Sequence, residues 1–107
     1  MPPRLSEQER ATLAALAGAL RRRFGVRVTS LMLFGSRSRG EGRDDSDLDV
    51  LVLLDGMTRE DRREVIDLAA DLSVASGLVL SPFVADPALF SPDLPLARAV
   101  ATDGVAL

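Results

Sequence analysis

Two aspartates separated by one residue, Asp47 and Asp49, carry the clearest chemical signal in this sequence, and an apolar run over residues 50–54 follows them directly. In an extended strand, residues i and i+2 point to the same side about 7 Å apart, so both carboxylates would face one pocket. A divalent cation relieves their repulsion, and Mg²⁺ is typically held by one or two carboxylates together with water and phosphate oxygens. The alternative is a simple turn, in which aspartate is common.

Gly35 and Ser36 end the preceding apolar run, residues 31–34. A glycine at the end of a strand lets the backbone come close to a ligand. Ser36 offers a hydroxyl and the start of a short helical turn, whose free N–H groups can bind an anion. A lone Gly-Ser pair is equally typical of a plain strand-ending turn. Together with the aspartates, however, the pair predicts a phosphate site facing a metal site.

Three arginines, Arg37, Arg39 and Arg43, lie between the two motifs. Guanidinium groups bind phosphate bidentately and could neutralise its charge. The alternative pairs them with the acidic residues of the same turn on a solvated loop. We prefer the solvated loop for Arg43, and both interpretations stay open for Arg37 and Arg39.

The combined pattern resembles the signature of the polymerase-beta-like nucleotidyltransferase superfamily. It consists of Gly35-Ser36, ten intervening residues and then Asp47-x-Asp49 leading into an apolar strand. At this length the chain is most similar to the minimal nucleotidyltransferases, with the strong resemblance over residues 31–54. The resemblance implies that Gly35 and Ser36 hold the nucleotide phosphates. It also implies that Asp47 and Asp49 hold Mg²⁺ for in-line attack on the α-phosphate, with release of pyrophosphate.

The sequence departs from this family at a third carboxylate, which full members carry on the next central strand to help activate the attacking hydroxyl. The predicted strand over residues 78–85 contains none, and Ser81 is its one polar side chain. Asp86 follows it, but an Asp-Pro pair is more simply explained as a helix cap. The sequence therefore predicts Mg-nucleotide binding more firmly than turnover.

The resemblance also implies a protein partner, because minimal nucleotidyltransferases are typically encoded beside a small helical toxin of the HEPN type. They neutralise this toxin, in some cases by adenylylating one of its tyrosines. Two functions follow: Mg²⁺-dependent transfer of AMP from ATP to a hydroxyl of the partner, or an antitoxin subunit that masks its partner sterically. Transfer to a small molecule is a weaker third option. The chain has no Tyr, which excludes modification of a tyrosine of its own.

Composition limits the remaining function classes. The 107 residues, 47% of them hydrophobic, predict one globular domain over residues 1–107. A net charge of −3 argues against general nucleic-acid binding. The absence of His and Cys excludes the usual zinc sites and Ser-His-Asp or Cys-His catalysis. No apolar run approaches the ~20 residues of a membrane span, so we expect a cytoplasmic protein without a membrane segment.

Local patterns predict an α/β (α+β) fold of the polymerase-beta-like type, a small mixed three-stranded sheet flanked by helices. The capping-box spacing of Ser6 with Glu9, and of Thr58 with Asp61, predicts the starts of two helices. Pro82 cannot donate to a ladder, which places its strand at an edge or bends it. The expected elements are helix 6–24, strands 26–34 and 48–54, helix 58–76, strand 78–85, short helical turns starting at Asp86-Pro87 and Ser91-Pro92, helix 96–102 and a possible terminal strand 105–107.

Overall fold

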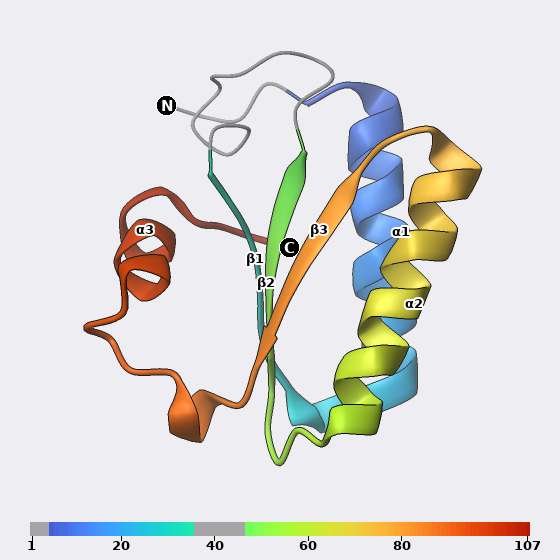
Figure 1. The fold of residues 1–107 in the computed structure, drawn as a ribbon. Coiled ribbons are helices and arrows are strands. Elements are labelled where there is room, and N and C mark those ends of the chain that lie inside the picture. The colour runs from blue at the N-terminus through green and yellow to red at the C-terminus, as the bar shows by residue number, and fades with distance from the viewer. Residues whose placement is uncertain (1–4, 36–46) are drawn as a thin grey trace.

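The protein is described by a computed structural model that covers residues 5–35 and 47–107. These residues form a mixed sheet with helices on both faces (Figure 1). The elements are α1 (Glu7–Phe24), a 3₁₀ turn (Gly25–Arg27), β1 (Val28–Phe34), β2 (Leu48–Leu54), α2 (Arg59–Ser76), β3 (Leu80–Ala85), a second 3₁₀ turn (Pro87–Leu89), α3 (Pro95–Asp103) and β4 (Val105–Ala106).

The sheet of the described residues has the strand order β3-β2-β1-β4. β1 runs antiparallel to both β2 and β4, whereas β3 runs parallel to β2. This confirms the predicted mixed sheet and the edge position of β3, whose Pro82 has no N–H to donate. The sheet has four strands where three were expected, because the two residues of β4 pair with Met32 and Leu33 of β1.

Both long helices begin as predicted. Ser6 and Glu9 form a reciprocal capping box at the start of α1, and Thr58 and Asp61 form one at the start of α2. Such boxes satisfy backbone N–H groups that have no partner inside the helix. α2 ends at Gly77, whose φ of +76° is the left-handed conformation common after a helix.

Several element boundaries differ from the prediction. The strand expected from residue 78 begins at Leu80, and the helix expected over residues 96–102 spans Pro95–Asp103. The strand expected from residue 26 begins at Val28, because Gly25–Arg27 forms a 3₁₀ turn that leaves Val26 almost fully exposed. Ser91-Pro92 starts a single hydrogen-bonded turn, as predicted, in which the backbone N–H of Leu94 donates to the carbonyl of Ser91. The Ser91 hydroxyl accepts a hydrogen bond from the backbone N–H of Asp93, and α3 begins only at Pro95.

The core lies between the sheet and the helices α1 and α2, while α3 lies on the opposite face (Figure 1). β2 is central in this arrangement, and its successive side chains point to opposite faces of the sheet. Its residues Leu48, Val50, Val52 and Leu54 belong to the core cluster with α1 and α2. The side chains between them, beginning with Asp49, consequently point to the face on which α3 lies.

None of the helices in the described part of the chain is both long and apolar enough to span a membrane.

Candidate active site

Gly35, Asp47 and Asp49 meet at one end of the sheet. β1 ends at Phe34 and β2 begins at Leu48, and the antiparallel register places Phe34 opposite Asp49. Gly35 therefore follows β1 beside the start of β2, at the upper end of the sheet in Figure 1. The structure brings together three of the residues that the sequence singles out.

Gly35 approaches the carboxylate of Asp49 more closely than any other residue type would allow. Its φ is +82°, in the left-handed region. A β-carbon placed on it would lie 2.6 Å from Oδ2 of Asp49, which is nearer than real β-carbons come to any atom. The sequence predicts that a glycine here lets the backbone come close to a ligand. In the structure, the group that comes close to Gly35 is the carboxylate of Asp49.

Asp47 and Asp49 lie on the same side of β2, as their spacing predicts. Asp47 is exposed, and Asp49 is partly buried. Burial raises the pKa of Asp49 above its ordinary value, and the negative charge of Asp47 raises it further. The two carboxylates thus place negative charge close together at this end of the sheet. A divalent cation on carboxylate oxygens would offset it, so the residues present fit a Mg²⁺ ion.

β3 contributes a third polar side chain to this end of the sheet. The parallel register pairs Ser81 with Asp49. The hydroxyl of Ser81 donates a hydrogen bond of 3.2 Å to Oδ2 of Asp47. Sequence reasoning had left the role of Ser81 open, and a signal for it was present in the order strand, helix, strand, which favours a parallel β3.

Asp86, the other candidate for a third carboxylate, lies at the opposite end of the sheet. It follows Ala85, which pairs with Leu53 near the end of β2, about 13 Å along the strand from Ser81. Its two carboxylate oxygens accept hydrogen bonds from the backbone N–H groups of Met57 and Ala88. Asp86 is a helix cap, the alternative that the Asp-Pro pair favoured.

Two phenylalanines flank the site on the same face. Phe34 and Phe83 are in edge-to-face contact, with ring centroids 5.3 Å apart. Phe83 comes two residues after Ser81 and is 42% exposed. Sequence reasoning missed this pair, which depends on the neighbouring positions of β1, β2 and β3.

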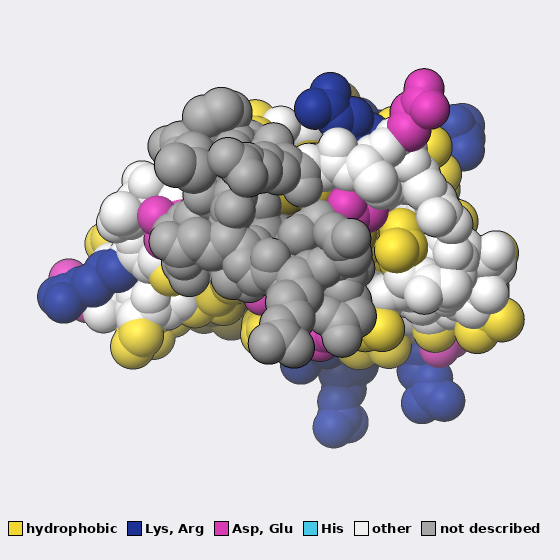
Figure 2. Space-filling view, turned by 90° about the horizontal axis from the view of Figure 1, so that it is seen from above, with side chains coloured by type: hydrophobic (Ala, Val, Ile, Leu, Met, Phe, Trp, Pro, Cys, Tyr) yellow, Lys and Arg dark blue, Asp and Glu magenta, His cyan; other side chains and the backbone are white. Residues whose placement is uncertain are grey.

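Ser36, Arg37 and Arg39, the other predicted nucleotide-binding residues, lie outside the described residues, as does Arg43. Within residues 5–35 and 47–107, no group of three or more His, Cys, Asp or Glu side chains gathers in a way that could hold a metal ion. Figure 2 views the molecule from the end at which Gly35 and Asp47 lie, and acidic side chains appear among hydrophobic ones toward the middle of this view.

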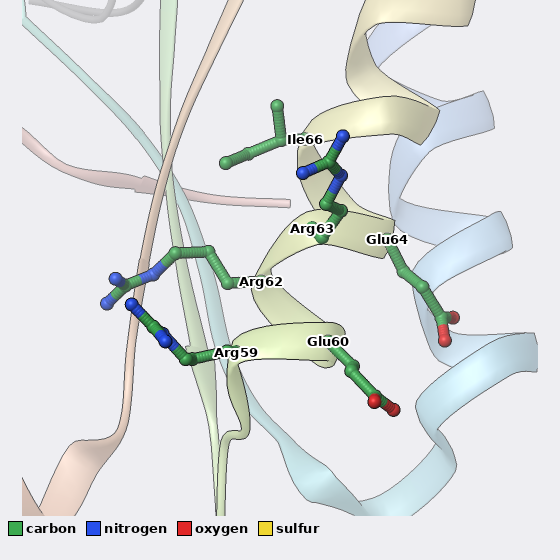
Figure 3. A pocket seen from close by; sticks show the side chains of 6 residues that line it. All are labelled: Arg59, Glu60, Arg62, Arg63, Glu64 and Ile66. Carbon is green, nitrogen blue, oxygen red and sulfur yellow. The ribbon is translucent and has the colours of Figure 1, made fainter.

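A separate surface cavity of about 700 Å³ lies along α2 and does not include the aspartates. Figure 3 shows Arg59 and Arg62 extending from α2 toward β3, where Arg62 donates to the backbone carbonyl of Val84. Arg59 is the first residue of α2, which follows the end of β2 opposite to Asp47. This cavity therefore belongs to the other end of the molecule.

Comparisons with known proteins agree with this geometry. The family model described as "Nucleotidyltransferase domain" matches residues 13–81, a stretch that contains both motifs. A Methanocaldococcus jannaschii protein that carries the provisional name of a protein adenylyltransferase is 31% identical over 83 residues, which are 78% of this chain and 79% of that protein.

Solved structures extend the similarity to the whole fold. A structure described provisionally as a minimal nucleotidyltransferase is 31% identical and has a TM-score of 0.60, with 92% of this chain and 91% of that one covered. A chain from a toxin–antitoxin structure with AMP-PNP is 28% identical and has a TM-score of 0.59, with 86% and 69% covered. The fold class predicted from the sequence is confirmed, and the chain belongs to the nucleotidyltransferase domain family as one of its minimal members.

Proposed function

We propose that this protein is a Mg²⁺-dependent nucleotidyltransferase that transfers AMP from ATP to a hydroxyl group of a partner protein. The observation that carries the proposal is the geometry of Gly35, Asp47 and Asp49. Two carboxylates share one face at the end of a buried strand, and a glycine with φ of +82° lies directly against one of them.

The proposed roles follow from the chemistry of each side chain. Asp47 and Asp49 would hold Mg²⁺, which when bound neutralises phosphate charge and polarises the α-phosphate. Gly35 and Ser36 would hold the nucleotide phosphates, and Arg37 and Arg39 would add positive charge to them. These assignments rest on the sequence pattern and on the positions of Gly35, Asp47 and Asp49.

The proposed reaction is an in-line displacement at the α-phosphorus of ATP. The hydroxyl oxygen of the acceptor forms a bond to this phosphorus, and the bond from the phosphorus to the bridging oxygen of the β-phosphate breaks. Pyrophosphate and the proton of the hydroxyl are released. The protein's contribution is to fix the phosphates and to concentrate negative charge where the cation binds.

The kind of acceptor is suggested by the relatives. One of them carries the provisional name of a protein adenylyltransferase, and another is part of a toxin–antitoxin structure. We infer that the acceptor here is a small helical toxin of the HEPN type and that its adenylylation neutralises it in the cytoplasm. The chain would thus be an antitoxin that acts as an enzyme.

The proposal is tested by incubating the chain with ATP labelled in the α-phosphate, Mg²⁺ and the product of the neighbouring gene. We expect label on the partner, and we expect Asp47→Asn and Asp49→Asn to abolish it. Asp71→Asn, which removes a carboxylate on the exposed side of α2, is the matched control and should label normally. Label that survives both site substitutions would contradict the assignment of the aspartates.

A second function is favoured by one observation. β3 presents Ser81 beside the aspartates and no carboxylate, so the site has two acidic side chains among the described residues. In this alternative the chain neutralises its partner by covering it, and nucleotide binding is regulatory. Asp49→Asn protein would then still neutralise the toxin and form the complex. Loss of neutralisation while the complex stays intact would instead favour the enzyme.

A further inference from the structure

Ser81 connects β3 to the aspartate pair. Its hydroxyl proton is donated to Oδ2 of Asp47, at an oxygen–oxygen distance of 3.2 Å. The two residues are 34 positions apart in the sequence, so the contact exists only because β3 runs parallel beside β2. Asp47 itself lies just before β2 and is exposed.

The neighbours of Ser81 cannot make this contact. Leu80 is buried in the core cluster on the other face of the sheet. Pro82 has no hydrogen-bond donor in its side chain or backbone. Phe83 returns to the face of the aspartates but is apolar and packs against Phe34. Ser81 is therefore the β3 residue that presents a polar side chain to Asp47.

We propose that Ser81 is a positioning residue for the metal site. By donating to Oδ2 it restricts the rotation of the Asp47 carboxylate, so that Oδ1 remains available to a cation. Hydrogen bonds to ligating carboxylates orient these groups, and their removal typically lowers metal affinity by about 10–100-fold. The inference rests on the proposed function, because it assumes that Asp47 and Asp49 bind the metal.

The first experiment measures Mn²⁺ affinity by electron paramagnetic resonance in the presence of AMP-PNP, and thermal unfolding in EDTA. Ser81→Ala is expected to weaken Mn²⁺ binding roughly tenfold without a comparable loss of stability. Ser81→Thr keeps the hydroxyl and suits a strand, so it should restore the affinity to within about twofold of the original protein. Ser91→Ala removes the hydroxyl of an exposed serine beyond β3, and as the matched control it should leave the Mn²⁺ affinity unchanged.

A second variant of Ser81 adds a negative charge to the site. Ser81→Asp would place a third carboxylate beside Asp47, and affinity for a hard cation rises with the number of charged ligands. We expect it to bind Mn²⁺ at least about tenfold more tightly, and to unfold at a lower temperature in EDTA than with Mn²⁺.

The outcomes separate this inference from the proposed function. Unchanged Mn²⁺ affinity in Ser81→Ala, with a large loss in Asp49→Asn, would overturn the role of Ser81 alone. Failure of Ser81→Thr to restore the affinity would do the same. Unchanged affinity in Asp49→Asn would overturn the proposed metal site itself.

Discussion

Gly35 meets two requirements at once, a positive φ and the absence of a β-carbon. The first is a property of its own backbone, because φ of +82° is unfavourable for residues with side chains. The second comes from Asp49, whose Oδ2 would lie 2.6 Å from an added β-carbon. The chain contains a natural comparison in Gly56, which has φ of +65° but no atom within 4 Å of such a carbon.

Gly35→Ala should therefore impair both folding and the site. We expect each of Gly35→Ala and Gly56→Ala to lose about 1–2 kcal/mol of unfolding free energy from the backbone conformation. Gly35→Ala should lose more, because the Asp49 carboxylate must move, and it should also weaken Mn²⁺ binding. Urea denaturation and Mn²⁺ titration measure the two effects. Equal results for the two variants would show that the contact with Asp49 is unimportant.

Asp49 should make stability depend on pH in an unusual direction for an aspartate. Its pKa in the folded protein is raised by burial and by the charge of Asp47. A raised pKa means that the folded state binds the proton more tightly, so the stability that protonation provides is present at low pH and is lost as pH rises through the folded pKa.

Asp49→Asn should accordingly raise the unfolding temperature at pH 7 in EDTA, relative to the original protein. This advantage should disappear near pH 3. A variant that is less stable at pH 7 would contradict this.

At the scale of elements, a single arginine just before β1 stabilises the turn between β2 and α2. Arg27, just before β1, donates to the backbone carbonyls of Asp55 and Gly56. It also forms a salt bridge with Asp61, which completes the capping box of α2, at 2.5 Å. The hydrogen bond from Arg27, together with those from Thr58, lowers the pKa of Asp61 from 3.8 to about 2. These contacts fix the start of α2 at the end of the sheet away from Asp47.

Asp61 should therefore contribute stability in the sense opposite to Asp49. Because its folded pKa is lowered, its contribution is fully present above pH ~4 and is lost as pH falls toward about 2. Asp61→Asn should lower the unfolding temperature above pH 4, and the difference from the original protein should shrink between pH 4 and pH 2. Circular dichroism at a series of pH values measures this. Asp71→Asn serves as the control, and a difference that stays constant over this range would contradict the assignment.

At the scale of the whole molecule, the sheet is covered by α1 and α2 on one face and by α3 on the other (Figure 1). The candidate site lies at one end of this sheet, on the face of α3, where β1 ends and β2 begins. Ligand binding at this end would be coupled to folding, because β1, β2 and β3 form the site only when they are paired.

Nucleotide and metal should therefore stabilise the protein together. At 100 times the dissociation constant, binding contributes about 2.7 kcal/mol, which for a domain of this size raises the unfolding temperature by on the order of 10 °C. We expect this shift with Mg²⁺ and AMP-PNP, and little of it with AMP-PNP in EDTA or in Asp49→Asn. Differential scanning fluorimetry measures it. A full shift in EDTA would show that the nucleotide binds without the metal site.

The sequence by itself determined the spacing of the two aspartates and most of the elements. Asp47 and Asp49 had to share a face because side chains alternate along a strand, and the capping boxes at Ser6 and Thr58 fixed where helices begin. These features depend on residues within a few positions of one another, which is why local patterns were sufficient for them.

The tertiary structure decided which distant side chains meet the aspartates. Ser81 and Asp86 are only five residues apart, yet the parallel register of β3 brings Ser81 to Asp47 and carries Asp86 to the opposite end of the sheet. A possible terminal strand was expected over residues 105–107, but its pairing with β1 was undetermined, because so short a strand forms only where another strand offers a free edge. Register and strand order depend on packing between segments far apart in the chain. The spacing of neighbouring residues does not predict this packing.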